Sequence, residues 1–224
     1  MSDTINVYLL ETVENLKWNH ICSMQKYVSV QRQKRINEYR FERDRISSLV
    51  TALMTRMIIS KHTGLAEYSL NFQTNKFGKP YLTNLKKYEF SISHSDRQSV
   101  FTDYKSSVGI DIEMLSNNIK EYKSIYENNF TINEIMHINQ SLNPFKEFIK
   151  IWTFKEAYVK MIGTGLSTPL SSFDVIKKSS NFKTLTTEYK SAIISVCCDC
   201  SCNNITIIPV TLEEITKFYN QIDI

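Results

Sequence analysis

The sequence predicts an α+β protein built from two similar units. A long helical pattern occurs twice, over residues 29–64 and 143–163, and each time short segments follow that alternate apolar and polar residues, as strands do. At 224 residues, of which 42% are apolar, the chain is also long enough to bury a core in one large domain or two small ones.

The first unit begins with a predicted strand at residues 5–12. The helical stretch that follows is expected to break near Tyr39–Arg43 and to end at Gly64, because glycine is common just after the last turn of a helix. Short strands are predicted next, with a turn at the Gly-Lys-Pro sequence 78–80. They span residues 70–75, 76–84 and 88–96.

The second unit begins with residues 99–113, which we expect to form a hairpin that leads into an acidic strand. A polar region follows, with one short helical pattern at residues 130–140. The second long helix has Asn143 as its predicted N-cap and Pro144 at its first position. Residues 172–208 alternate between strand and turn patterns, and a short helix is expected at residues 211–221.

Composition excludes several classes of protein. The net charge of +4 is too small to indicate a nucleic-acid partner by itself. No segment approaches 18 uninterrupted apolar residues, so no transmembrane helix and no membrane partner are expected. The N-terminal residues are acidic and lack the basic start of a signal peptide, which favours the cytoplasm.

The cysteines gather in one short segment. Four of the five lie within VCCDCSC, at Cys197, Cys198, Cys200 and Cys202. Structural zinc sites use two separated ligand pairs, and this spacing on a predicted strand does not provide them. We expect buried or half-exposed thiols here, rather than disulfides or a metal site.

Acidic side chains occupy one face of the strand that begins at Val108. Asp111 and Glu113 alternate with apolar residues, so the two carboxylates point to the same side. They repel each other unless a positive charge lies between them. In the second long helix, Glu156 and Lys160 share one face with Trp152, and Lys155 lies at its edge. Three carboxylates beside two lysines suit a divalent cation and phosphate oxygens, as in metal-assisted phosphoryl transfer.

Basic residues concentrate between positions 26 and 61, where few acids accompany them. This bias favours a polyanionic ligand or an acidic partner. A solvated helix face is the alternative explanation for such a run.

These motifs resemble the signature sequences of Sfp-type 4′-phosphopantetheinyl transferases. The sequences G-I-D-I-E at 109–113 and W-x-x-K-E-A-x-x-K at 152–160 are similar to the two main motifs of the family. F-G-K-P at 77–80 and F-S-I-S-H-S at 90–95 resemble its upstream motifs, and residues 163–173 continue the match. The resemblance therefore covers nearly the whole chain.

The resemblance implies two similar α/β subdomains in a pseudo-twofold arrangement, with coenzyme A bound in the cleft between them. Residues 1–105 would form the N-terminal subdomain, which contacts the 3′-phosphate and adenine. Residues 106–224 would form the C-terminal subdomain with magnesium and the catalytic residues. The implied reaction moves the 4′-phosphopantetheine arm of coenzyme A onto a serine of an apo acyl or peptidyl carrier protein and releases adenosine 3′,5′-bisphosphate.

The same resemblance assigns roles to the motif residues. Asp111, Glu113 and Glu156 are expected to hold Mg²⁺ against the diphosphate. Lys160 is expected to contact phosphate during catalysis, with Lys155 as a second contact to coenzyme A. Upstream residues are assigned to coenzyme A as follows: Arg32 and Arg35 to the 3′-phosphate, Ser93 and His94 to phosphate, and Lys79 and Pro80 to the adenine.

Two points remain open from the resemblance. Many members carry an arginine where this chain has Ser47, and Arg43 or Arg45 is a candidate replacement. The serine hydroxyl must also lose its proton during attack. Glu156 is the first candidate for this general base and Glu134 is the second, since a tight metal ligand is a poor base.

Two rival functions use similar residues. A metal-dependent nuclease also has clustered acids and a lysine, but usually as a lone Asp followed by E-x-K on an adjacent strand. A catalytically silent carrier-binding module would be expected to lack one of the acids or Lys160, and this chain keeps them. The native pathway stays open among fatty-acid, polyketide, nonribosomal peptide and lysine biosynthesis. The length favours a monomer, because the short trimeric members are about half this size.

Overall fold

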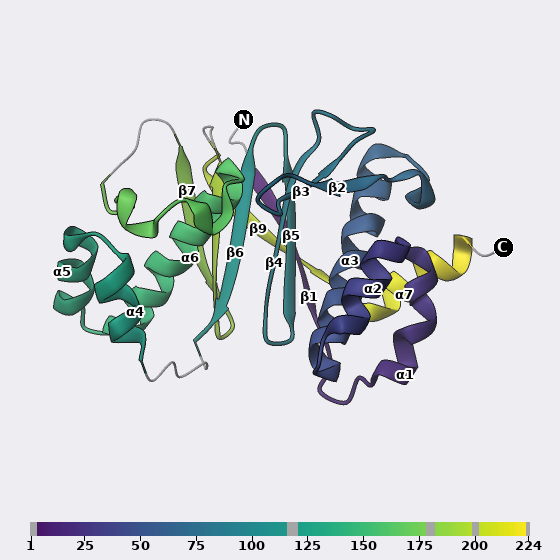
Figure 1. Ribbon diagram of the computed structural model, residues 1–224, viewed down its shortest axis with the longest axis horizontal. Coiled ribbons are helices and arrows are strands. Elements are labelled where there is room, and N and C mark those ends of the chain that lie inside the picture. The colour runs from purple at the N-terminus through teal and green to yellow at the C-terminus, as the bar shows by residue number, and fades with distance from the viewer. Residues whose placement is uncertain (1–3, 116–120, 178–181, 199–201, 223–224) are drawn as a thin grey trace.

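The computed structural model of the chain describes residues 4–115, 121–177, 182–198 and 202–222. Its helices and strands form two lobes that lie side by side (Figure 1). The elements up to residue 104 are β1 (Thr4–Glu11), α1 (Trp18–Ile21), α2 (Val30–Glu38), α3 (Glu42–Thr63), β2 (Phe72–Thr74), β3 (Pro80–Leu82), β4 (Glu89–Ser95) and β5 (Gln98–Tyr104). The later elements are β6 (Val108–Met114), α4 (Tyr122–Asn129), α5 (Ile132–Gln140), α6 (Pro144–Ile162), β7 (Lys183–Tyr189), β8 (Ala192–Cys198), β9 (Asn204–Val210) and α7 (Leu212–Ile222).

The strands form two main sheets and a small hairpin. The four-stranded sheet has the order β4-β5-β1-β9, the three-stranded sheet has the order β6-β8-β7, and β2 pairs with β3. Each lobe thus contains a sheet covered by helices, which confirms the predicted α+β class.

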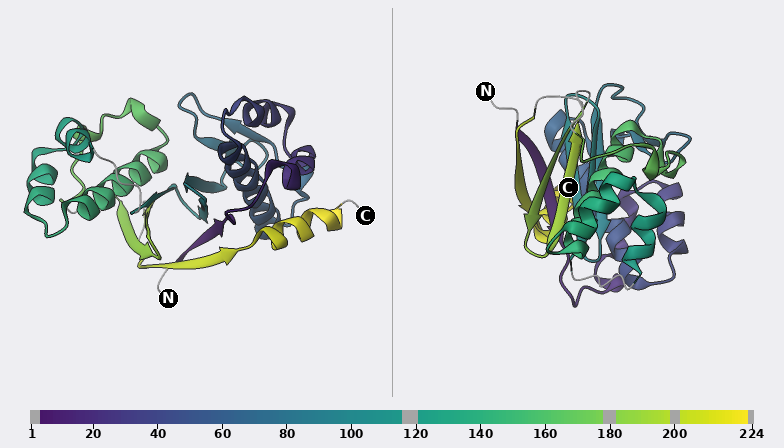
Figure 2. Two further views of the ribbon diagram at one scale, coloured as in Figure 1. Left: turned by 90° about the horizontal axis from the view of Figure 1, so that it is seen from below. Right: turned by 90° about the vertical axis from the view of Figure 1, so that its left-hand side faces the viewer.

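The C-terminal residues belong to the first lobe, and this corrects the expected boundary. Strand β9 pairs in parallel with β1, with Asn204 opposite Thr4. Helix α7 packs against α3, where the Tyr219 hydroxyl donates to the Leu53 carbonyl at 3.0 Å. The left view of Figure 2 shows the end of the chain returning in this way. Residues 204–222 therefore complete the N-terminal lobe, whereas residues 106–224 were predicted to form the second one.

Strands β5 and β6 do not form the predicted hairpin. Although only a few residues separate them, β5 pairs with β4 and β1, and β6 pairs with β8. The chain crosses from one sheet to the other at this point. Because of this crossing, β6 lies beside the edge strand β4 of the first sheet, and the two strands are joined by side-chain hydrogen bonds in place of a backbone ladder.

The long helices begin and end where the sequence predicts. Ser29 caps α2 through a bond from the Arg32 amide, and α3 ends at Gly64 in the left-handed conformation, with φ of 72°. The Asn143 side chain accepts from the Lys146 amide at the start of α6. Helix α4 was not predicted, because its polar and Asn-rich sequence has only a weak apolar pattern.

Helix α6 lies unusually close to β6, and Gly109 is the reason. A Cβ atom built at Gly109 would lie 1.9 Å from the Ala157 carbonyl oxygen and 2.4 Å from the Met161 nitrogen. Only glycine therefore permits this contact between helix and strand. The close approach brings the α6 side chains to the acidic strand.

The cysteine segment lies at the end of β8. Cys197, Cys198 and Cys202 are buried, and the Cys198 and Cys202 sulfur atoms lie 2.6 Å apart. Cys200 lies outside the described residues.

Among the helices of the described chain, none is long and apolar enough to cross a membrane.

Candidate active site

The two sheets meet where β4 runs beside β6, and three serines of β4 make the contacts. The Ser91 hydroxyl accepts from the Ile110 amide at 3.0 Å, Ser93 donates to Asp111 Oδ1 at 2.7 Å, and Ser95 donates to Glu113 Oε2 at 2.9 Å. The alternation in F-S-I-S-H-S places all three serines on one side of the strand. This alternation is a sequence signal for Ser91 and Ser95, which our sequence analysis missed.

A buried carboxylate lies at the centre of this contact between the lobes. Lys160 Nζ lies 2.7 Å from Asp111 Oδ1 and 2.8 Å from the Ser93 hydroxyl. The Asp111 side chain is 6% exposed and that of Lys160 is 30% exposed. Asp111 Oδ2 is buried and has no hydrogen-bond partner among the described residues. An unpartnered buried carboxylate oxygen favours a cation as its partner.

The raised pKa values of the two neighbouring carboxyl groups also indicate that a positive charge would be stabilising here. Burial, and next the Asp111 carboxylate, raise the pKa of Glu113 to about 7, although the Ser95 hydrogen bond and Lys160 act in the opposite direction. Burial, followed by Asp111, also raises the pKa of Glu156, against the charge of Lys160. The structure thus brings Asp111, Glu113 and Glu156 into one electrostatic cluster, as predicted from the sequence.

The carboxylates of this cluster fit a magnesium ion that takes some of its ligands from a bound substrate. No group of three His, Cys, Asp or Glu side chains within the described residues is arranged as a ready-made metal cage. Mg²⁺ usually binds one or two carboxylates and takes its remaining ligands from phosphate and water. Asp111, with its unpartnered oxygen, and Glu113 are able to supply such carboxylates, and magnesium ligation by Asp111, Glu113 and Glu156 stays a prediction.

A cavity of about 430 Å³ opens beside the cluster. It is lined by Arg43, Asp44, Ser47, His94, Ser95 and Asp96. Burial, and then the charges of Lys160 and Arg32, lower the pKa of His94, which favours the neutral ring with one nitrogen as donor and the other as acceptor. Arg32 belongs to the first lobe and Lys160 to the second, and the charges of both lower the pKa of His94. Basic groups from the two lobes therefore lie near the same cavity.

Among the arginines considered for the 3′-phosphate, Arg43 lines this cavity, and Arg32, Arg35 and Arg45 are not among its lining residues. Arg32 Nη2 donates to the Ser48 carbonyl at 3.2 Å, while its buried Nε has no partner among the described residues. Arg35 is exposed on α2. The Arg45 guanidinium lies over the Trp18 ring at 5.5 Å, whereas Arg43 lines the cavity. Of the two candidate replacements for an arginine at position 47, the structure therefore favours Arg43.

Lys79 lies at a second contact between the lobes. Its Nζ donates to the Met161 carbonyl at 3.0 Å and to the Val108 carbonyl at 3.4 Å, and it pairs with Glu89 at 3.5 Å. Burial lowers its pKa, and Glu89 acts in the opposite direction. Lys79 and Pro80 also line a cavity of about 250 Å³. Their assignment to adenine stays a prediction.

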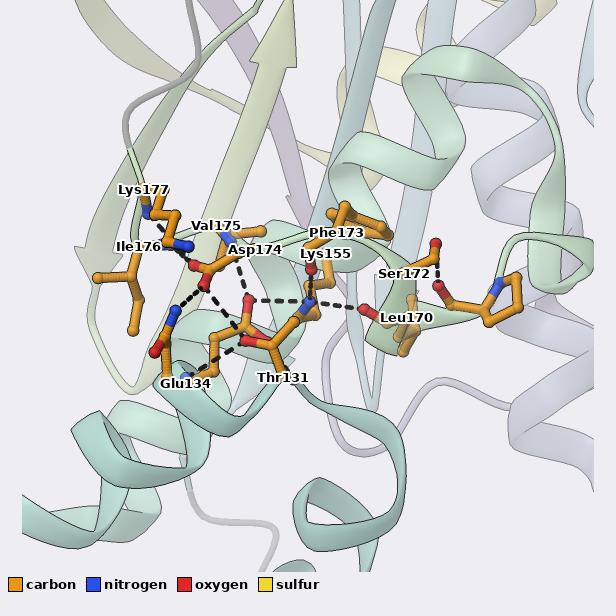
Figure 3. A network of polar contacts seen from close by, with 12 residues as sticks. Thr131, Glu134, Lys155, Leu170, Ser172, Phe173, Asp174, Val175, Ile176 and Lys177 are labelled. Carbon is orange, nitrogen blue, oxygen red and sulfur yellow. Dashed lines mark hydrogen bonds and ion pairs between the residues drawn. The ribbon is translucent and has the colours of Figure 1, made fainter.

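Lys155 and Glu134 are buried and pair with each other. Figure 3 shows this pair and its contacts. Both side chains have zero exposure, and Lys155 Nζ lies 2.8 Å from Glu134 Oε1. Successive helix residues are rotated by about 100°, so Lys155 points away from the face of Glu156 and Lys160. The structure does not bring this pair to the site, and neither a coenzyme A contact by Lys155 nor proton transfer by Glu134 fits such burial.

Comparison with known proteins identifies relatives for both lobes. A model of the 4′-phosphopantetheinyl transferase superfamily matches residues 107–202, and a model of the 4′-phosphopantetheinyl transferase N-terminal region matches residues 16–105. A 4′-phosphopantetheinyl transferase of Bacillus subtilis is 30% identical over 155 residues, which are 68% of this chain and 67% of that protein.

Two further relatives have related names. The 4′-phosphopantetheinyl transferase gsp of Aneurinibacillus migulanus is 28% identical over 208 residues, which are 86% of this chain and 85% of that protein. The L-aminoadipate-semialdehyde dehydrogenase-phosphopantetheinyl transferase of Saccharomyces cerevisiae is 33% identical over 150 residues, which are 63% of this chain and 55% of the yeast protein.

Proposed function

Because the chain belongs to the 4′-phosphopantetheinyl transferase superfamily, we propose that it loads apo acyl or peptidyl carrier proteins in a magnesium-dependent reaction. It transfers the 4′-phosphopantetheine arm of coenzyme A to a carrier serine. The observation that carries this proposal is the buried Asp111 carboxylate, which is held by Lys160 and Ser93 and has one oxygen without a partner. Neither a nuclease nor a silent binding module accounts for this carboxylate together with the family relationship.

The reaction exchanges one phosphorus–oxygen bond for another. The serine oxygen bonds to the phosphorus that carries pantetheine, and the bond from that phosphorus to adenosine 3′,5′-bisphosphate breaks. The serine proton passes to a base, and the leaving group keeps the electron pair. Bound magnesium would be held by Asp111 and Glu113, with Glu156 as the third candidate ligand, and would neutralise charge on the diphosphate.

The chain's own residues prepare this reaction. Lys160 places an ammonium group beside Asp111, from where it is able to contact a phosphate oxygen. Ser93 holds the Asp111 oxygen and thereby fixes the orientation of the carboxylate. Glu156 is the better candidate for the proton acceptor, because its raised pKa brings it closer to neutral pH and Glu134 is enclosed in its ion pair.

The partners follow from the reaction. The substrates are coenzyme A and a carrier protein with an accessible serine, and we propose that the enzyme acts as a monomer. The residues assigned to the site would contact coenzyme A and magnesium, so the choice of carrier would depend on surfaces outside the site. We therefore propose broad carrier tolerance.

Mass spectrometry tests the function directly. The purified protein is incubated with coenzyme A, Mg²⁺ and several apo carrier proteins. We expect each accepted carrier to gain the mass of one phosphopantetheine on a serine, and EDTA to stop the gain. No mass gain on any carrier, while coenzyme A still binds, would contradict the proposed activity.

Replacing Arg32 by alanine should weaken the binding of coenzyme A more than that of its 3′-dephospho form. A lost charge-assisted hydrogen bond costs about 1.5–3 kcal/mol, or roughly tenfold to a hundredfold in dissociation constant. Calorimetric titration measures both ligands, and Lys34→Ala, an exposed change on the same helix, is the matched control. An equal loss for the two ligands would remove Arg32 from the 3′-phosphate site.

A further inference from the structure

The buried pair of Lys155 and Glu134 has every polar group satisfied. Lys155 Nζ has three donors, and it contacts Glu134 Oε1 at 2.8 Å, the Leu170 carbonyl at 2.7 Å and the Phe173 carbonyl at 2.6 Å. Glu134 Oε1 also accepts from the Val175 amide at 2.8 Å, and its Oε2 accepts from the Thr131 amide at 2.9 Å. The pair thus has a fixed geometry.

Stability alone is a weak explanation for such a pair. Removing two charges from water is costly, and well-packed apolar residues often stabilise a core equally well or better. What an ion pair with five directional contacts adds is a defined orientation of the segments that it joins. Here it joins the first turn of α5, the middle of α6 and the segment 170–175 that follows α6 (Figure 3).

Helix α6 has a second attachment at its C-terminal end. There Lys79 Nζ donates to the Met161 carbonyl at 3.0 Å, and the Asn75 side-chain amide donates to the Gly163 carbonyl at 2.7 Å. The two attachments enclose the short stretch that carries Glu156 and Lys160. Glu156 directly follows Lys155, and Lys160 directly precedes Met161. Rotation or sliding of α6 at Lys155 would therefore displace both functional side chains from β6.

We propose that Lys155 and Glu134 form a positioning pair, which sets the rotation of α6 and so places Glu156 and Lys160 opposite Asp111. This inference rests on the proposed function, because it assigns the pair to the geometry of that site. Neither residue contacts the substrate; both act through the helix. A displacement of about 1 Å at a reacting group is enough to cost about a hundredfold in rate.

The test compares two substitutions on the same face of α5. Glu134→Gln removes the charge of the pair at nearly constant shape, and Ile138→Ala, one turn later, removes apolar contacts from the same core without touching the pair. Both are expected to lower the melting temperature. At a temperature where both are folded, Glu134→Gln should lower kcat about a hundredfold with little change in KM for coenzyme A. Ile138→Ala should keep kcat within about threefold.

A second measurement does not depend on transfer. Binding of Mn²⁺ in the presence of coenzyme A, followed by electron paramagnetic resonance, should weaken about tenfold in Glu134→Gln, as for other groups that orient metal ligands. Lys155→Gln should repeat both effects if it folds. Wild-type kcat and Mn²⁺ affinity in folded Glu134→Gln, or equal losses in Ile138→Ala, would overturn the positioning role.

The two proposals fail in different ways. If the wild-type protein binds coenzyme A and transfers nothing, the proposed function is wrong, and the Mn²⁺ affinities still decide whether the pair positions α6. If the wild-type protein is active and Glu134→Gln is equally active, only the positioning role is wrong.

Discussion

Asp111→Asn is expected to abolish phosphopantetheine transfer while the protein stays folded. The asparagine oxygen still accepts from Lys160 and Ser93, but the negative charge that would hold the metal is lost. Loss of about 4 kcal/mol of transition-state stabilisation corresponds to roughly a thousandfold in rate. Single-turnover transfer to an apo carrier protein, followed by mass spectrometry, measures this loss.

The same substitution should not lower stability. The Asp111 charge raises the pKa of its neighbours Glu113 and Glu156, so in the absence of metal these carboxylates repel one another. We therefore expect Asp111→Asn to melt at the same or a higher temperature than the wild type in EDTA. Such an exchange of activity for stability is typical of functional sites.

A matched control removes a carboxylate elsewhere in the same lobe. Glu188 lies on β7, where it pairs with Lys146 at the surface. Glu188→Gln should transfer at the wild-type rate, because exposed pairs contribute little. An Asp111→Asn protein that keeps more than a tenth of the wild-type rate would show that Asp111 is not needed for the reaction.

Gly109→Ala should strongly destabilise the second lobe. The added methyl group would overlap the backbone of α6 at Ala157 and Met161, which is unable to turn aside as a side chain would. Overpacking a core costs about 1–3 kcal/mol, and we expect about 3 kcal/mol or more here because backbone must move. Urea unfolding measures the free energy of unfolding.

Gly64→Ala is the control for this prediction. A Cβ atom at Gly64 meets no atom within 4 Å, so only the left-handed conformation, with φ of 72°, opposes the change. That conformation costs about 1–2 kcal/mol for a residue with a side chain. A Gly109→Ala protein as stable as Gly64→Ala would contradict the close packing of α6 on β6. In any folded fraction, the displaced helix should also lower transfer.

The sequence alone predicts most of the helices and strands and the two motifs that carry the acidic residues, because both depend on local patterns. The predicted end at Gly64 and the predicted N-cap at Asn143 agree with the bounds of α3 and α6. The alternation along β6 places Asp111 and Glu113 on one side of a strand, and helical spacing places Glu156 and Lys160 together. Such signals are contained in a few neighbouring residues.

Other features depend on partners that are distant in sequence. Nothing near Lys155 shows that Glu134 and the carbonyls of residues 170 and 173 will enclose it, so the adjacent motif suggested a ligand contact instead. Strand β6 pairs with β8 rather than with β5, and no local sequence pattern predicts which of the two sheets it joins. The position of β9 beside β1 is a third case.

The return of the chain to β1 affects the order in which the protein is made. Strand β1 lacks its parallel neighbour until residues 204–210 have been synthesised, and α3 lacks the Tyr219 contact until residue 219 has been synthesised. At about 5–20 residues per second, the ribosome leaves this edge and the apolar side of α3 uncovered for roughly ten seconds or more. The lobe that emerges first is therefore the last to be completed.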